Sequence, residues 1–387
     1  MKTFIGVIYL SFWKYENDEI LKILEDKFEN ILYLDLRNLY PGIYNRVNPF
    51  SEEKLPRSAT KFENIKSFNE FLKLNNVIII NGFGDQKKAY WPLLRVIKSS
   101  GSKMVGYQPN SGFRGSNKSI SLAANQNSVS VKIKEKFLFL LYLFLVNFSV
   151  LPKYDLFFIS GSSNIKRVKK YSYLFKKVIP IHSSSFETAR NSFCNIEKKY
   201  IVFLDIAMPF IKDFKDWGCQ NIDSKKYFES LNFFFNKLER EFNQEVIICA
   251  HPQLLPENDY LFDGRKVVRF ETCSYVAMAS IVVAHFTNAL QYAVIFDKPI
   301  VFLDSKYFNS YIRESINYFT KEFKSLKVNL SNFNSKQIKD FYTKKFNKEN
   351  YQNYKQNYLV EKSKMNKSNS TIVEEEFTQK FNLLLKK

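Results

Sequence analysis

The stretch "IVVAHFTNALQYAVIFDKPIVFL", residues 281–303, contains a complete strand–helix–strand pattern. Two short apolar runs, Ile281–Ala284 and Pro299–Leu303, are rich in β-branched residues and predict buried strands. The segment between them predicts a helix through Leu290–Ile295, and Thr287 is placed to cap its start. Alternating strands and helices are typical of parallel sheets, because a parallel connection has to cross one face of the sheet.

The same alternation extends along most of the chain. In the first half, strands are expected at residues 3–10, 31–36, 77–81, 103–107, 155–160 and 178–181. In the second half, they are expected at 200–204, 245–250, 266–270, 281–284 and 299–303, with a weaker one near 326–330. The predicted fold class is therefore α/β, with two doubly wound Rossmann-like domains followed by C-terminal helices.

The length of 387 residues suits two domains of ordinary size. A polar, unpatterned segment around residues 186–198 is expected to be the linker between them. We therefore expect one Rossmann-like domain over residues 1–185 and a second over 199–334. Residues 335–387 are mostly helical in pattern and are expected to pack across the two domains.

The chain is strongly basic, with 58 Lys and Arg against 38 Asp and Glu and a net charge of +20. Such a balance favours anionic partners. No Lys/Arg run is dense enough for a nucleic-acid tail, so a nucleic acid is not an expected partner. The cluster at 166–170 fits a solvated surface or, as a sharper alternative, attraction to an anionic membrane. The 4 cysteines form no CxxC pair, which fits a reducing cytoplasm.

An apolar run, "FLFLLYLFLVNFSVL", occupies residues 137–151. Its length falls short of the roughly 20 residues of a membrane-spanning helix, and Asn147 and Pro152 also count against a span. A buried helix is the preferred interpretation, an interfacial helix the second and a spanning helix the last. The expected location is the cytoplasm, with peripheral attachment to the inner face of the cell membrane as an option.

Several polar residues follow predicted strands of the second half. In open α/β sheets, ligands bind at the carboxyl ends of the strands, so these side chains are candidate site residues. They are Asp205, His251, Glu271, Thr272, His285, Thr287 and Asn288.

Each candidate has a functional and a structural interpretation. Pro252 forces an extended backbone on His251, whose imidazole could bind a nucleotide phosphate or ribose, or could simply be satisfied at a strand end. Asp205 and Asp213 could serve as a general base or a nucleophile, or could cap a helix, and the two roles have equal weight. The helix start at Thr287 could bind phosphate, although ordinary capping is the simpler interpretation.

The second half resembles bacterial surface-polysaccharide glycosyltransferases of the GT-B fold, in particular sialyltransferase-like and Kdo-transferase-like enzymes. The segments that carry the resemblance are "FLDIAMPFIKD" (203–213), "IICAHPQ" (247–253), "RFETCSYVAMASIVVAHFTNAL" (269–290) and "AVIFDKPIVFL" (293–303). The first half departs from the family, because "NGFGDQ" (81–86) supplies only Asp85 where an acidic pair is expected. A second departure is Thr287-Asn288 in place of a Ser/Thr pair.

The resemblance implies a site for a CMP-activated acidic sugar in the C-terminal domain and an acceptor site in the N-terminal domain. Asp205 and Asp213 become the candidate catalytic carboxylates. The expected nucleotide-binding residues are His251, Pro252, Thr272, His285, Thr287 and Asn288.

The expected function is transfer of a sugar such as sialic acid, Kdo or a related nonulosonic acid from CMP to a bacterial surface glycan. The partners are then the nucleotide-sugar donor, a glycan or lipid-linked glycan acceptor, and an anionic membrane surface. No metal or other cofactor is expected, because no DxD motif follows a predicted strand. Open alternatives are a UDP- or GDP-sugar transferase, a CDP-glycerol glycerophosphotransferase, and a catalytically degenerate GT-B scaffold.

Overall fold

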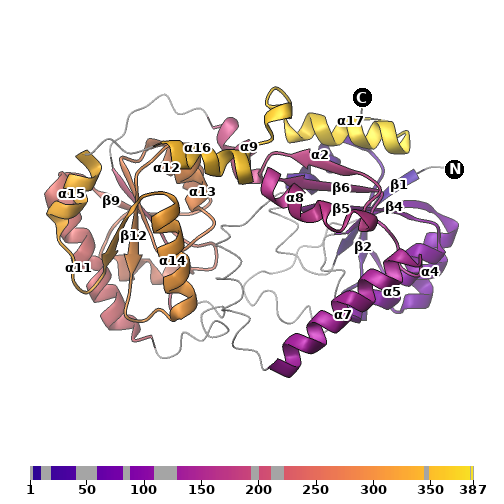
Figure 1. Cartoon of the computed structure of the whole chain (residues 1–387), viewed down its shortest axis with the longest axis horizontal. Helices are drawn as coiled ribbons and strands as arrows, with labels where there is room; N and C mark the ends of the chain where they lie inside the picture. Colours follow the sequence, from indigo (N-terminus) through magenta and orange to yellow (C-terminus); the bar gives the residue numbers. More distant parts are fainter. Residues whose placement is uncertain are drawn as a thin grey trace. The chain divides into compact units, whose positions relative to one another are not determined.

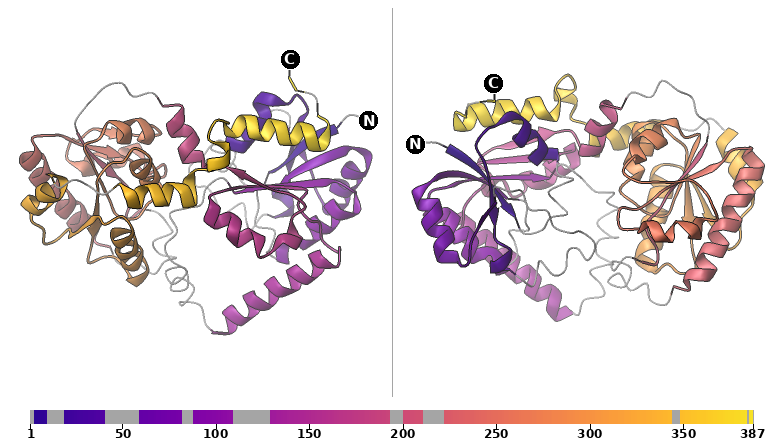
Figure 2. Two further views of the ribbon diagram at one scale, coloured as in Figure 1. Left: turned by 45° about the horizontal axis from the view of Figure 1, so that its top comes forward. Right: turned by 180° about the vertical axis from the view of Figure 1, so that it is seen from behind.

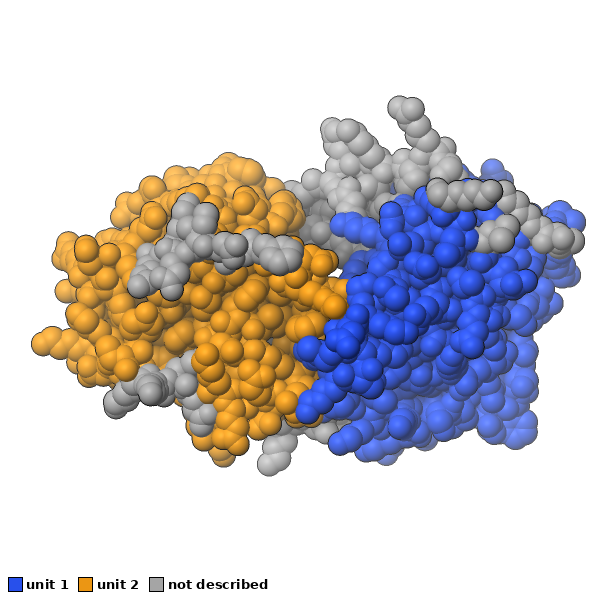
Figure 3. Space-filling view, turned by 90° about the horizontal axis from the view of Figure 1, so that it is seen from above, with its two compact units in different colours: residues 1–111, 128–184, 360–387 blue, residues 112–127, 185–359 orange. Residues whose placement is uncertain are grey.

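The computed structural model (Figure 1) describes residues 3–9, 19–40, 59–81, 88–108, 129–192, 200–210, 222–343, 348–383 and 385–386. Asp213 and Asp85 lie outside these residues. The chain forms two compact units, coloured separately in Figure 3. Of the described residues, unit 1 holds those within 1–111, 128–184 and 360–387, and unit 2 those within 185–359.

Unit 1 is built on a seven-stranded parallel sheet of order β3-β2-β1-β4-β5-β6-β7. Its strands are β1 (Thr3–Tyr9), β2 (Ile31–Asp35), β3 (Ala59–Lys61), β4 (Asn76–Asn81), β5 (Lys103–Gln108), β6 (Leu156–Ser160) and β7 (Val178–Ile181). The order runs outward from β1 in one direction and then from β4 in the other, which is the doubly wound Rossmann order. The short strand β3 was not among the strands expected from the sequence.

Helices cover both faces of this sheet (Figure 1). They are α2 (Glu19–Lys27), α4 (Ile65–Leu74), α5 (Trp91–Ser99), α7 (Val129–Asn147), α8 (Ser162–Lys169) and α17 (Asn369–Phe381), with short helices η1 (Arg37–Leu39), η2 (Lys88–Tyr90), η4 (Ser172–Leu174) and η7 (Lys362–Lys364). One core lies under α4, α5 and α7, and the other under α2 and α17. The C-terminal helix therefore completes the core of the N-terminal sheet, where Phe377 packs against Phe28 and Phe158 at ring distances of 5.7 and 6.0 Å.

Unit 2 contains a six-stranded parallel sheet of order β10-β9-β8-β11-β12-β13. Its strands are β8 (Ile201–Leu204), β9 (Val246–Cys249), β10 (Val267–Val268), β11 (Ile281–Ala284), β12 (Ile300–Asp304) and β13 (Leu326–Asn329). Its helices are α9 (Ser184–Arg190), α11 (Ser224–Phe242), α12 (Thr272–Met278), α13 (Leu290–Ile295), α14 (Ser310–Glu322), α15 (Ser335–Thr343) and α16 (Glu349–Tyr354), with η5 (Pro256–Phe262) and η6 (Lys355–Leu359). This sheet has the same winding as the first (Figure 2).

The predicted α/β class with two Rossmann-like domains is confirmed by these two sheets. The expected linker around residues 186–198 instead begins inside helix α9, where Glu187 and Ala189 are buried. Residues 193–199 of that segment lie outside the described residues. The C-terminal segment divides between the units after Leu359.

Polar side chains fix where several helices begin. A short polar side chain just before a helix satisfies one of the free backbone N–H groups of the first turn. The caps are Asn64 on α4, Asp223 on α11, Asn309 on α14 and Ser368 on α17, each accepting from the N–H three residues later.

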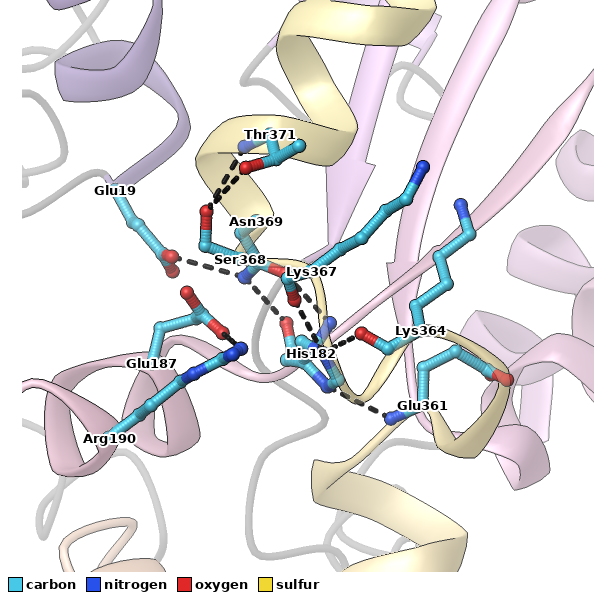
Figure 4. A network of polar contacts seen from close by, with 10 residues as sticks. All are labelled: Glu19, His182, Glu187, Arg190, Glu361, Lys364, Lys367, Ser368, Asn369 and Thr371. Atoms are coloured by element: carbon cyan, nitrogen blue, oxygen red, sulfur yellow. Dashed lines mark hydrogen bonds and ion pairs between the residues drawn. The ribbon is translucent and has the colours of Figure 1, made fainter.

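Buried hydrogen bonds join the start of α17 to the end of β7 (Figure 4). The His182 N–H donates to Asn369 Oδ1 at 2.8 Å, and Asn369 Nδ2 donates back to the His182 carbonyl at 2.9 Å. The Glu361 N–H donates to His182 Nδ1 at 3.1 Å, so the neutral ring carries its proton on Nε2 and donates it to the Lys364 carbonyl at 3.1 Å. His182 and Asn369 are both fully buried, so each of these bonds replaces water.

We predict that Asn369→Ala lowers the free energy of unfolding by about 2–4 kcal/mol, because it removes two buried hydrogen bonds to the backbone N–H and carbonyl of His182. Urea denaturation followed by circular dichroism measures this. Asn366→Ala is the matched control, because Asn366 is exposed on the same connection. Equal losses of stability in the two variants would contradict the contribution of the hydrogen bonds between His182 and Asn369.

Candidate functional site

The strand order of unit 2 reverses direction between β8 and β11. Leu204 at the end of β8 pairs with Cys249 on β9 and with Ala284 on β11. The loops that follow these strands therefore leave the sheet at one level, side by side. In open α/β sheets this is where ligands bind. We call the loops that follow these strands, residues 206–210, 250–255, 269–272 and 286–289, the carboxyl edge.

Asp205 lies directly behind the carboxyl edge and is only 5% exposed. Its Oδ2 accepts the His251 N–H at 3.1 Å, and the backbone N–H groups of Ile206 and Ala207 also donate to the carboxylate. Burial raises the pKa of Asp205 to about 6, and the bond from the His251 N–H is the largest effect that opposes this rise. The carboxylate thus ties the loop after β8 to the loop after β9.

His251 is held through both its backbone and its ring. Besides the bond from its N–H to Asp205, its Nδ1 accepts the Gln253 N–H at 3.2 Å. The neutral ring therefore carries its proton on Nε2. His251 is half-buried and Pro252 beside it is exposed, so both residues lie at the carboxyl edge.

The loop after β10 exposes an aromatic residue, Phe270, at a position that was expected to lie within the strand. Expected to span residues 266–270, β10 covers only Val267–Val268. Phe270 follows with φ +62° and a side chain that is 75% exposed. A bulky residue in this region of φ is uncommon and marks a specially formed turn. The flanking Arg269 and Glu271 were the available signal that the strand had already ended.

Arg269 and Thr272 hold this loop in place. The Arg269 guanidinium donates to Asp259, with a 3.0 Å bond from Nη1 and a second bond from Nη2. Thr272 begins α12, and its hydroxyl bonds the sulfur of Cys249, whose pKa is raised to about 12 by burial. Both residues therefore support the loop that exposes Phe270.

His285 does not face the carboxyl edge. The ring is fully buried, Nδ1 donates to the Leu303 carbonyl at 2.8 Å, and the Tyr227 hydroxyl donates to Nε2 at 2.8 Å. Phe203 and Phe308 pack edge-on against it. Both nitrogens already have partners, so we assign His285 a structural role in place of the expected contact with a nucleotide.

Thr287 and Asn288 lie in the turn before α13. The helix starts at Leu290, and its N-cap is Ala289, without a side-chain cap bond. The expectation that Thr287 caps this helix is therefore wrong: its hydroxyl oxygen accepts the Ala289 N–H at 3.3 Å, in the turn directly before the helix. Thr287 is half-buried and Asn288 is exposed, so both side chains belong to the carboxyl edge.

The carboxyl edge thus combines the imidazole of His251, the ring of Phe270, the hydroxyls of Thr272 and Thr287 and the amide of Asn288. These come from loops after β9, β10 and β11, and Asp205 lies behind them, directly after β8. Such a set can contact an aromatic base and hydrogen-bond sugar and phosphate oxygens. Among the residues that the structure describes, no His, Cys, Asp and Glu side chains gather as metal ligands would.

Several solved structures are similar to this chain along most of its length. UDP-GlcNAc 2-epimerase from Methanocaldococcus jannaschii is 11% identical with a TM-score of 0.46, covering 90% of this chain and 95% of its own. MnaA of S. aureus, solved with UDP, is 11% identical with a TM-score of 0.47 and coverages of 99% and 98%. The glycosyltransferase SnogD from Streptomyces nogalater is 11% identical with a TM-score of 0.39, covering 92% and 95%. No protein-family model matches the sequence, and a comparison with curated proteins finds no significant match.

The buried His285 should make the free energy of unfolding depend on pH. Its pKa is lowered from 6.5 to about 4, mainly by burial, so unfolding takes up a proton between these values. Stability is therefore complete above pH 6.5 and falls as the pH drops toward 4. From pH 7 to pH 5, this group alone should lower the free energy of unfolding by about 2 kcal/mol.

The measurement is urea denaturation of the wild type and His285→Asn at both pH values. The variant lacks this titration, so its stability should change by about 2 kcal/mol less than that of the wild type. Equal changes in the two proteins would contradict the buried, neutral state of the ring.

Proposed function

We propose that the protein is a glycosyltransferase that binds its nucleotide-sugar donor at the carboxyl edge of unit 2. The observation that carries this proposal is His251, fixed by Asp205 beside the point where the strand order reverses. The proposed donor is a CMP-activated acidic sugar such as sialic acid, Kdo or a related nonulosonic acid. The proposed acceptor is a bacterial surface glycan, free or lipid-linked, bound by unit 1 in the cytoplasm at the inner face of the membrane.

Each side chain has a distinct proposed role. His251 donates from Nε2 to a phosphate oxygen of the donor, which stabilises the charge that develops on departing CMP. Phe270 stacks on the base. Thr272 bonds the ribose, and Thr287 and Asn288 bond the phosphate.

The carboxylates divide between two proposed roles. Asp205 is buried and its oxygens bond backbone N–H groups, so we propose it as the residue that positions His251. Asp213 is proposed as the catalytic carboxylate, acting as general base on the acceptor hydroxyl. With hydrogen-bond donors at the phosphate, we expect transfer without a metal ion.

His251→Ala should lower the rate of CMP release from a CMP-sugar by about 100-fold, because one donor to the developing charge is lost. The assay measures CMP released in the presence of a glycan acceptor. Gln253→Ala is the control, because it keeps the backbone N–H that bonds His251. A rate within a factor of a few of the wild type would remove His251 from the mechanism.

Thermal-shift measurements with CMP, CDP, UDP and GDP identify the donor class, because a ligand of the folded state raises the melting temperature. A response to UDP or GDP alone would replace the CMP-sugar donor, and a response to CDP with CDP-glycerol turnover would indicate glycerophosphotransfer. No response to any of them would favour a degenerate scaffold.

The positioning role of Asp205 is tested by a double-mutant cycle. Asp205→Asn places an amide NH2 where backbone N–H groups donate, so it should release His251 and slow CMP release. In a protein that already carries His251→Ala, the same substitution should have little further effect. Additive losses would show that Asp205 acts independently of His251.

A further inference from the structure

Helix α7 of unit 1 carries a continuous apolar stripe on its outer surface. The stripe consists of Ile133, Phe137, Leu140, Phe144 and Phe148, whose side chains are 54–64% exposed. Their spacing of three or four residues places them on one face of the helix. Phe144 and Phe148 contact each other at a ring distance of 4.2 Å, so the stripe continues past the end of the helix.

The opposite face of α7 is also apolar, and it is covered. Tyr142 and Val146 are fully buried in the core shared with α4 and α5, and Leu138, Leu141 and Leu145 pack against it. A helix that is apolar on all sides is normally buried on all sides. Here one face meets its own unit and the other meets solvent, as the position of α7 at the periphery of unit 1 shows (Figures 1 and 2). The sequence-based preference for a buried helix therefore holds for one face of α7 and is wrong for the other.

Exposed cations accompany the stripe. Lys134 and Lys136 lie in its first turns. On α8 and directly after it, Lys166, Arg167, Lys169 and Lys170 are exposed, and none of them forms an ion pair with an acidic side chain that the structure describes. The two helices are linked through Tyr171, which directly follows Lys170 and packs edge-on against Phe139 of α7 at 5.5 Å. This contact places the end of α8 next to α7, while Lys134 and Lys136 of α7 itself flank the stripe.

We propose that this face of unit 1 binds the surface of a bilayer that contains anionic phospholipid. The apolar stripe enters the boundary between headgroups and acyl chains, and the cations of α7 and α8 contact the headgroups. No helix among the described residues is long and apolar enough to cross a membrane, so α7 lies along the surface. The inference rests on the part of the proposed function that places the protein at a membrane, and is independent of sugar transfer.

Charge favours lipid over a second copy of the chain as the occupant. Two copies that joined their stripes would cover the apolar side chains but would offer no anionic layer to the exposed cations of α7 and α8. An anionic headgroup layer supplies the opposite charge over the whole face. The excess of positive charge on the chain, +20, acts in the same direction.

The test is flotation of the full-length protein with two kinds of vesicle, phosphatidylcholine alone and equal parts of phosphatidylcholine and phosphatidylglycerol. We expect binding to the anionic vesicles and at least about tenfold weaker binding to the neutral ones. Replacing Phe137, Leu140 and Phe144 together by Ser should weaken binding by at least about tenfold. Leu74→Ser is the matched control, because Leu74 is 75% exposed on α4 of the same unit.

The cationic contribution is measured with Lys166, Arg167, Lys169 and Lys170 replaced together by Gln. This variant should bind anionic vesicles at least about tenfold more weakly, and added salt should weaken the wild type in the same way. Equal binding to the two kinds of vesicle, or unchanged binding of the triple Ser variant, would overturn the proposal. The proposal would also be overturned if the wild type did not bind vesicles but formed dimers in sedimentation, and the triple Ser variant stayed monomeric.

The thermal response to CMP separates this inference from the proposed function. The triple Ser variant should keep the wild-type response, because its substitutions lie in unit 1 and outside the carboxyl edge. Vesicle binding without any nucleotide response would contradict the sugar-transfer proposal alone.

Discussion

The geometry of the carboxyl edge depends on a buried carboxylate that backbone N–H groups surround. A carboxylate without such donors would be too costly to bury at the end of β8. With them, Asp205 has a pKa of about 6 and is mostly ionised at neutral pH, so the N–H groups of its own loop and of His251 are held by charge-assisted bonds. Two further bonds hold the same loop: the Gln253 N–H donates to His251 Nδ1, and the Leu254 N–H donates to the His251 carbonyl. Together with the bond to Asp205, they position the imidazole.

Local pattern was sufficient to predict the fold class. Short β-branched runs separated by helical segments can close their backbone hydrogen bonds and bury their apolar faces together only in parallel, layered sheets. Local pattern did not predict the bounds of the two-residue strand β10 or the existence of the short strand β3. Their boundaries depend on pairing with β9 and β2, which a single sequence does not encode locally.

The two Ala-His pairs at strand ends show why the site could be predicted only in part. Ala250-His251 and Ala284-His285 have the same pattern, yet one ring lies at the edge and the other in the core. Register explains the difference: Leu204 pairs with Cys249 and with Ala284, so His285 is level with Asp205 while His251 lies one residue beyond it. The partner of His285, Tyr227, lies 58 positions away, and no local pattern in the sequence indicates it.

The two sheets share one topology but differ in how their polar strand ends are used. In the described part of unit 1, Asp35 at the end of β2 is paired with Arg37 at 2.8 Å, and Asn81 at the end of β4 donates to the Tyr154 hydroxyl at 2.7 Å. These side chains satisfy each other inside the unit. At the carboxyl edge of unit 2, the buried polar groups instead support groups that reach the surface. Asp205 fixes His251, and Thr272 and Arg269 fix the turn that exposes Phe270. A surface whose exposed groups are positioned by buried and partly buried bonds is suited to recognition, and this is the physical reason for the proposal that unit 2 binds the nucleotide.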